Sequence, residues 1–300
     1  MRWTKIGQIY QFKSIDEFCI SHASNPLAIH LHDDLYRVFF SGRDRENKSS
    51  VAYVDIDIET LKVVGEADQT LFLHGADDSF YSHGVSIGNM YEANGQNYIL
   101  FMGWQIRNGG HWRGDIGRLR LDKSNMLVLD PATPFMSSDE EDPISLSYPW
   151  VMQDDGIYKM WYGSTITWDA GNNEMLHVIK YATSPDGEKW EKHGIAIPYA
   201  LGTAQAFSRP SVIRDDQGYH MWFSYRSGDG TRYRIGYAHS IDGQLWKNRL
   251  DDVGIDVSPE GWDSEMICYP FVFDHKGKRY MLYNGNQYGK EGFGLAIKKE

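Results

Sequence analysis

The sequence lacks several features that would assign the chain to a broad class of proteins. It has only two cysteines, Cys19 and Cys268, which lie far apart and form no disulfide framework or metal pattern. We expect both to be free, buried thiols. No segment approaches the roughly 18 consecutive apolar residues of a membrane-spanning helix, and the N-terminus has no apolar signal-peptide core. We therefore expect a soluble, cytoplasmic protein without a membrane partner.

Positive charge is also scarce. The chain has 30 Lys and Arg against 41 Asp and Glu, a formal net charge of −11. Nucleic-acid binding needs clustered basic side chains that contact phosphates, so a nucleic-acid partner is not expected. The histidines show no ligand spacing, and neither a metal nor another cofactor is expected. Calcium bound by carboxylates or carbonyls of the tunnel is the alternative that the sequence leaves open.

What the sequence does contain is a repeat of short aromatic strands separated by turn clusters. The ranges 209–213, 219–223 and 233–238 and a fourth range beginning at 244–246 are predicted as four successive strands. The same order of motifs recurs about 60 residues earlier and about 60 residues later, with Pro149, Pro210 and Pro270 opening equivalent strands. Four strands in each repeat indicate a β-propeller blade.

The length of the chain then predicts the number of blades. A repeat of about 60 residues fits five times into 300 residues. We therefore expect an all-β fold, a single five-bladed propeller domain over residues 1–300 with four-stranded antiparallel blades. The two earlier blades are predicted at 25–29, 35–40 and 50–56, and at 82–87, 98–103 and 116–121.

The two ends of the chain are expected to close the ring. The segment 3–9 resembles the segment 190–196, which is the predicted outermost strand of its blade. The last blade lacks such a strand after its third one, at 293–296. Pairing the N-terminal strand with the last blade would complete that blade and remove an open sheet edge.

The topology of a propeller also sorts polar residues by face. Strands run from the central tunnel outward and alternate in direction, so loops entering the first strands share a face with loops after the second strands. On the other face, the Ser-x-Asp-Gly-x-x-Trp turns at 184–190 and 240–246 are interpreted as structural. The first face gathers carboxylates, arginines, amides and indoles, a combination that suits a carbohydrate.

Two carboxylates on that face are the candidate catalytic groups. Glu265 lies beside Trp262 and Met266, and apolar surroundings would raise the pKa of its side chain, as a general acid requires. Asp44 would be the base or nucleophile. Alternatively, Glu265 pairs with an arginine or caps a loop, and Asp44 belongs to a salt-bridged loop.

Other residues on the same face are candidate binding groups. The arginines would bind a carboxylate or phosphate, or neutralise the two carboxylates. His111 and Trp112, after the glycines at 109–110, would form a lid or a plain surface loop. The predicted substrate-binding residues are Arg43, His83, Trp104, Arg209, Arg226, Asp263, Tyr269, Asn284 and Asn286.

Several of these motifs carry a family resemblance. The Pro-opened strands, the Tyr-x-Met-Trp runs at 158–161 and 219–222 and the repeat ends at 181–190 and 237–246 resemble the propellers of glycoside hydrolase families 32, 43, 68 and 130. The run at 262–270 resembles bacterial propellers found among surface-polysaccharide genes. At the positions of the family 43 catalytic carboxylates this chain has Asn25, Tyr148 and Ser208, so that catalytic set is not carried over.

Together these observations lead to three functional hypotheses. The first is a glycosidase in which Glu265 protonates the leaving oxygen and Asp44 activates water or attacks directly. The second is a glycoside phosphorylase, as in family 130, in which Arg43, Arg209 and Arg226 hold phosphate. The third is a non-catalytic protein that binds a glycan or sugar nucleotide on the same fold. The sugar, the linkage and the oligomeric state are not predicted.

Overall fold

The computed structural model describes residues 1–106, 109–122 and 126–299. Within these residues the regular secondary structure is almost entirely β-strand, which confirms the predicted all-β class. The strands are β1 (Trp3–Gln11), β2 (Ser21–His32), β3 (Leu35–Arg43), β4 (Ser49–Asp57), β5 (Lys62–Glu66), β6 (Gly84–Ala93), β7 (Gln96–Ile106), β8 (Trp112–Leu121), β9 (Leu127–Leu129), β10 (Leu146–Asp154), β11 (Ile157–Thr167), β12 (Leu176–Ser184), β13 (Glu191–Ile195), β14 (Ser208–Asp215), β15 (Gly218–Tyr225), β16 (Arg234–Ser240), β17 (Lys247–Asn248), β18 (Cys268–His275), β19 (Lys278–Asn284) and β20 (Gly292–Lys298). A 3-10 turn (Leu250–Asp252) and a short helix α1 (Asn286–Gly289) complete the described elements.

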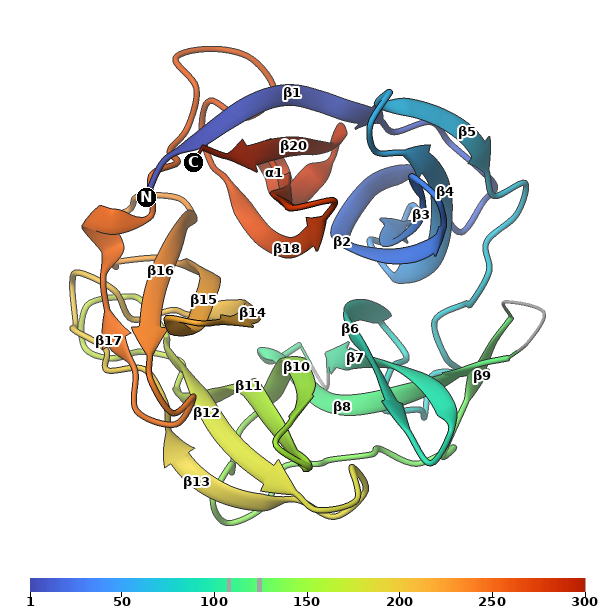
Figure 1. The fold of residues 1–300 in the computed structure, drawn as a ribbon. Helices are drawn as coiled ribbons and strands as arrows, with labels where there is room; N and C mark the ends of the chain where they lie inside the picture. Colours follow the sequence, from blue (N-terminus) through green and yellow to red (C-terminus); the bar gives the residue numbers. More distant parts are fainter. Residues whose placement is uncertain (107–108, 123–125, 300) are drawn as a thin grey trace.

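The strands form antiparallel sheets around a common centre (Figure 1). Three sheets have four strands each, in the orders β10-β11-β12-β13, β14-β15-β16-β17 and β1-β20-β19-β18. The remaining strands form two antiparallel groups, β2 to β5 and β6 to β9, which are joined by a single parallel pair between Ser49 and Gly84. Strands β2, β6, β10, β14 and β18 lie nearest the centre in Figure 1.

Aromatic side chains on the second strands fill the space between neighbouring sheets. Trp161 on β11 and Trp222 on β15 are fully buried. The Trp161 indole donates a hydrogen bond of 2.8 Å to the carbonyl of Gly243 in the turn of the next sheet. Burying side chains of this size on both faces of a strand is a main source of stability for stacked sheets.

The turn at 240–246 explains one difference from the predicted strands. The Asp242 carboxylate accepts hydrogen bonds from the backbone N–H groups of Gln244 and Leu245, at 2.8 and 2.9 Å. These two residues are therefore held in the turn, and strand β17 begins only at Lys247. In the equivalent turn, hydrogen bonds from the backbone N–H groups of Lys189 and Glu188 lower the pKa of Asp186 to about 2. Both turns are structural.

The N-terminal strand pairs with the C-terminal strand. β1 is antiparallel to β20, from Trp3 opposite Lys298 to Gln11 opposite Gly292. The two ends of the chain consequently lie close together in Figure 1. A long-range contact strengthens this pairing, because Lys5 on β1 forms an ion pair of 2.7 Å with the buried Asp263.

The strands nearest the centre share a local irregularity. β2, β6, β10, β14 and β18 each shift register against their second strand at an equivalent place. At this bulge Asn25, Tyr148, Arg209 and Tyr269 all have positive φ, between 35° and 57°. Each of them precedes a proline, where an extended backbone is usual, so this conformation is strained. Strain of this kind concentrates at functional sites.

Candidate functional site

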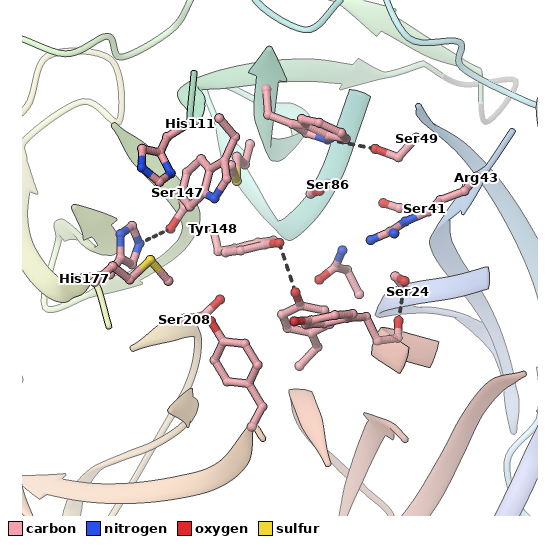
Figure 2. Close-up of a pocket in the computed structure, with 18 of the residues that line it drawn as sticks. Ser24, Ser41, Arg43, Ser49, Ser86, His111, Ser147, Tyr148, His177 and Ser208 are labelled. Atoms are coloured by element: carbon pink, nitrogen blue, oxygen red, sulfur yellow. Dashed lines mark hydrogen bonds between the residues drawn. The ribbon is translucent and has the colours of Figure 1, made fainter. Parts of the chain in front are cut away.

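A cavity of about 520 Å³ lies at the centre of the sheets, next to the strained positions. Aromatic, hydroxyl and basic side chains dominate its wall. In Figure 2, His111, Ser147 and His177 lie on one side, Tyr148 lies near the middle, and Arg43 enters from the opposite side. The lining residues are Ser24, Asn25, Ser41, Arg43, Ser49, Ser86, Met102, Trp104, Ile106, Gly110, His111, Trp112, Ser147, Tyr148, Met175, His177, Ser208, Arg226, Tyr233, Tyr269 and Tyr288.

None of the described residues that line this central cavity is Asp or Glu. Its charged groups are the guanidinium groups of Arg43 and Arg226. A third guanidinium, that of Arg209, lies buried at the bulge beside Tyr148 and Tyr269. The wall of the central cavity therefore carries basic groups and, among the described residues, no acidic one.

The remaining polar groups of the central cavity are neutral hydrogen-bonding groups. Burial raises the pKa of the phenols of Tyr148, Tyr233 and Tyr269, so they are protonated at neutral pH. Burial, with a smaller effect of Arg226, lowers the pKa of His177 to about 3. Its neutral ring is held between the hydroxyls of Ser147 at 2.6 Å and Thr165 at 2.8 Å. Hydroxyls, phenols and neutral imidazoles can each exchange hydrogen bonds with sugar hydroxyls.

Some of the predicted binding residues meet in this cavity. Arg43, Trp104, Arg226 and Tyr269 all line it, although they come from different strand groups. The Trp104 indole is held by a hydrogen bond of 3.0 Å to the Ser49 hydroxyl. An indole fixed in this way presents a rigid surface to a ligand.

Glu265 lies outside the central cavity, and the prediction of apolar surroundings for its side chain is wrong. Its side chain is 51% exposed and forms an ion pair with Arg232. Its backbone N–H is bound by the side chain of Asn286, at 2.8 Å, so the loop rather than the cavity determines its position. Glu265 does not line the central cavity, and the role of general acid there has no geometric support.

Asp44 caps its own loop. Its carboxylate accepts hydrogen bonds from the backbone N–H groups of Glu46 and Lys48, at 2.8 and 2.9 Å. His74 lies 3.6 Å away on the other side. The chain turns sharply after β3, and the carboxylate satisfies the backbone donors of that turn. Asp44 is thus directed into the loop and does not line the central cavity.

Arg209 is buried in the centre of the molecule, and its side chain is turned to the backbone. It is 2% exposed and donates hydrogen bonds of 2.8 Å to the carbonyls of Tyr269 and Pro26, and a longer one of 3.5 Å to Gly88. Burial lowers its pKa to about 9. The guanidinium thus links the first strands of different sheets through their backbone carbonyls. These bonds give Arg209 a structural role in place of the predicted contact with a ligand.

Asp263 and Asn284 also have structural partners. Asp263 binds Lys5 and accepts a hydrogen bond of 3.0 Å from the Tyr283 hydroxyl. Asn284 accepts a hydrogen bond from the backbone N–H of Asn25 and donates to the carbonyl of Ala23, each at 2.8 Å. Both side chains are buried. Neither side chain is free for the predicted role in substrate binding. Instead, each bonds a residue near the N-terminus from a position near the C-terminus.

The last two predicted binding residues also lie outside the central cavity. Asn286 accepts hydrogen bonds from the backbone N–H groups of Glu265 and Met266, at 2.8 and 3.2 Å, and so holds their loop. The His83 ring packs beside Trp104, with 5.8 Å between the ring centres. His83 therefore supports the wall from behind and does not form part of it.

Sequence reasoning missed Glu174. Its carboxylate, 14% exposed, binds the guanidinium of Arg226 at 2.8 Å. It lines a second cavity of about 560 Å³, which shares Arg43 and Arg226 with the first. Glu174 lies in a connection before β12 that follows no repeat motif, so no signal in the sequence distinguishes it from other surface carboxylates.

Five further residues of the cavity wall stand out in the sequence without being predicted to bind substrate. Asn25, Tyr148 and Ser208, at the family 43 carboxylate positions, all line the central cavity. His111 and Trp112 line it too, and the His111 ring stacks on Trp168 at 4.6 Å. Residues 107–108, in the loop before this predicted lid, lie outside the described residues.

The described residues contain neither a candidate metal site nor a membrane-spanning helix. No group of three or more His, Cys, Asp or Glu side chains in this part of the chain is arranged to hold a metal ion. None of the helices described is long and apolar enough to cross a membrane.

Solved structures with the same fold are glycoside hydrolase-like. A structure of a BT0996 RGII complex matches 99% of this chain and 91% of its own, with a TM-score of 0.75 and 13% identity. A structure from work on the GH130 family of mannoside phosphorylases, which contains glycoside hydrolases that target beta-1,2 mannosidic linkages in Candida mannan, matches 99% and 90%, with a TM-score of 0.69 and 13% identity. The resemblance to glycosidase propellers is thus confirmed at the level of fold.

A much closer relationship appears in sequence. The chain is 41% identical over 299 residues to Uncharacterized protein Rv1502 of Mycobacterium tuberculosis, and the match covers 99% of each protein. The same values hold for Uncharacterized protein MT1551 from another strain of that organism. The chain is therefore a member of the family of these mycobacterial proteins. No protein-family model matches it.

Proposed function

We propose that this protein binds a carbohydrate in the central cavity. The observation that carries the proposal is the composition of the wall, which combines tryptophans and tyrosines with hydroxyls and two guanidinium groups and has no carboxylate among its described residues. Aromatic faces cover the C–H faces of sugar rings, and the polar groups bind their hydroxyls. The RGII complex of one fold neighbour agrees with a sugar ligand.

The fold proposed for this function is a single five-bladed propeller over residues 1–300. The strand groups β2–β5, β6–β9, β10–β13 and β14–β17, with β18–β20 completed by β1, support this interpretation. The pairing of β1 with β20 would close the ring. The central cavity would then be the mouth of the tunnel, into which every blade directs its first strand.

A binding role fits the central cavity better than the two-carboxylate mechanism. Retaining and inverting glycosidases place two carboxyl groups about 5 to 10 Å apart around the bond that is cleaved. Neither Glu265 nor Asp44 lines the cavity, and the family 43 positions carry Asn25, Tyr148 and Ser208.

The test is sugar binding by the full-length protein. An array of mono- and oligosaccharides would identify ligands, and titration calorimetry would measure their dissociation constants. Trp104→Ala should weaken binding about tenfold or more, because it removes a fixed aromatic surface. Trp190→Ala is the matched control, since Trp190 is another partly buried indole that does not line the cavity. Equal effects of both variants, or no binding on the array, would reject the proposal.

A second candidate is cleavage of a glycoside by phosphate or water, with the Glu174 carboxylate as the group that accepts and returns the proton. Two observations favour it. Glu174 contacts Arg226, which lines both cavities, and the GH130 family named for one fold neighbour contains phosphorylases and hydrolases. A single positioned group of this kind would accelerate such a reaction roughly 10²–10⁴-fold.

Assays of the array-selected sugars with and without inorganic phosphate would test this candidate. Glu174→Gln should abolish product formation but preserve sugar binding, whereas Glu140→Gln, at an exposed position, should leave both unchanged. Product release that survives Glu174→Gln would exclude Glu174 as the proton-transfer group. A protein that binds sugar and releases no product under either condition is a binding protein.

A further inference from the structure

The second cavity adjoins the first and is strongly basic. The two cavities share Arg43, Arg226 and two tyrosines, so a ligand in one can extend into the other. Besides the two shared arginines, Arg232 and Lys290 line the second cavity, and Glu174 is the single acidic residue on its described wall. In a chain with a net charge of −11, this local excess of positive charge is unusual.

Arg43 is the most informative of these cations. It ends β3, is partly buried, and its guanidinium has no ion pair or hydrogen bond with any other residue that the structure describes. Figure 2 shows this guanidinium directed toward the middle of the central cavity. A guanidinium has five N–H donors in a fixed fork, and leaving all of them without an acceptor at a partly buried site costs free energy.

Arg226 is only partly satisfied. One nitrogen binds Glu174, and the ring of Tyr233 lies 4.7 Å from the guanidinium carbon. Its Nε atom is buried and has no hydrogen-bond partner. The single carboxylate of Glu174 therefore cannot satisfy both shared arginines, and the wall has donors to spare for an anion.

The remaining basic residues, Arg232 and Lys290, line the second cavity. The ammonium group of Lys290 has no ion pair with another described residue, and Arg232 faces only the exposed carboxylate of Glu265. His22, also on this wall, is kept neutral, because burial, Arg43 and Lys290 lower its pKa to about 3. The positive charges that line this cavity repel one another, and a bound anion would relieve that repulsion.

The geometry points to a phosphate subsite in the second cavity, between Arg43 and Arg226. On this basis the carbohydrate ligand is a sugar that carries a covalently attached phosphate or diphosphate. Phosphate has several acceptor oxygens and bears up to two negative charges at neutral pH, which matches two arginines with free donors and a nearby lysine. A uronic acid has only one carboxylate, which would accept hydrogen bonds from the guanidinium of one arginine but not from both. This inference rests on the proposed sugar binding in the central cavity.

Titration calorimetry on the full-length protein tests the inference. The probes are hexose 1-phosphates, hexose 6-phosphates and uridine-diphosphate hexoses, each compared with the free hexose, with glucuronic acid and with inorganic phosphate. At least one phosphorylated sugar should bind about tenfold tighter than its free hexose or more, as charge-assisted hydrogen bonds predict. Its affinity should fall with added salt.

The matched variants are Arg43→Gln and Arg45→Gln. Arg45 is exposed, lies two residues further along the same loop and lines neither cavity. Arg43→Gln should lower the affinity for the phosphorylated sugar about tenfold more than it lowers the affinity for the free hexose, so that the preference for the phosphorylated sugar is lost. Arg45→Gln should leave both affinities unchanged. If Arg43→Gln does not fold, Lys290→Gln at the exposed rim replaces it and should weaken only the phosphorylated sugar.

The outcomes separate this inference from the proposed function. Binding of free sugars with no gain from phosphate, or a gain that Arg43→Gln and Arg45→Gln reduce equally, overturns the phosphate subsite alone. A gain from glucuronic acid equal to that from phosphate also overturns it. Tight binding of inorganic phosphate with no binding of any sugar rejects the proposed function and retains the subsite.

Discussion

The Arg209 guanidinium donates a hydrogen bond of 2.8 Å to the backbone carbonyl of Tyr269, which lies on the neighbouring sheet. Both residues occupy the strained bulge before a proline, and the same guanidinium reaches Pro26 on β2. A single buried side chain thus joins three sheets at the centre. Because it bonds only to carbonyls, its charge has no counterion among the described residues and adds to that of the basic groups around the central cavity.

Arg209→Lys should destabilise the protein although it preserves the charge. A lysine has one ammonium group and cannot bond carbonyls on separate strands with a planar fork. We expect the free energy of unfolding to fall by about 2 kcal/mol, the value of hydrogen bonds to a charged donor. Urea denaturation would measure the change, with Arg45→Lys on an exposed loop as the control. A loss of stability no larger than that of the control would show that the bonds to the carbonyls contribute nothing.

The strands were predictable from the sequence for physical reasons that the site does not share. A run such as 219–223 consists of buried, strand-forming aromatic residues and lies between turns that contain Gly and Asp. The residues of the run and its turns are therefore enough to predict a strand there. The position of Glu265 depends instead on Asn286, Arg232 and a loop path that no local pattern encodes. Residues tied to the repeat itself, such as Tyr148 and Tyr269 before their prolines, could be placed at the centre.

Two buried histidines should make the protein sensitive to acid. The pKa of His177 is lowered to about 3, mainly by burial, and that of His22 to about 3 by burial, Arg43 and Lys290. Above about pH 6.5 both histidines are neutral in the folded and unfolded states, and they contribute no pH dependence. Below that value only the unfolded state binds the protons. The free energy of unfolding should therefore fall by about 2 kcal/mol per histidine by pH 5 and continue to fall toward pH 3.

Urea denaturation of the wild type and His177→Gln at pH 7 and pH 5 would check this expectation. The variant lacks one of the two protonation sites but can still hydrogen-bond Ser147 and Thr165, so it should lose about 2 kcal/mol less than the wild type between these pH values. His32→Gln, at an exposed position, should behave as the wild type. An equal loss in His177→Gln and the wild type would mean that His177 titrates normally in the folded protein.

Replacing Glu265 should strengthen, not weaken, the binding of a phosphorylated sugar. Its carboxylate pairs with Arg232, which lines the second cavity. Glu265→Gln frees that guanidinium and removes a negative charge, and because exposed ion pairs are worth up to about 1 kcal/mol, affinity should rise by about two- to fivefold. The gain should disappear at high salt.

The matched control for Glu265 is Glu260→Gln, an exposed carboxylate nearby in sequence that lines neither cavity. It should leave the affinity unchanged. Neither substitution should change the free energy of unfolding by more than about 0.5 kcal/mol. A large loss of binding or turnover in Glu265→Gln alone would contradict the placement of Glu265 outside the functional site and restore it as a candidate catalytic group.

Trp3 should be essential for anchoring β1 to the neighbouring sheet that contains β15. It is 6% exposed on β1 and packs edge-on against Trp222, with 5.7 Å between the ring centres, while its backbone N–H bonds the carbonyl of Gly254. Trp3→Ala would leave a large void beside that indole, and we expect the free energy of unfolding to fall by about 3–5 kcal/mol. Ile6→Ala, at an exposed position of the same strand, should cost less than about 0.5 kcal/mol. If urea denaturation gave equally small losses for both variants, β1 would be a peripheral strand whose pairing with β20 contributes little to the stability of the sheets.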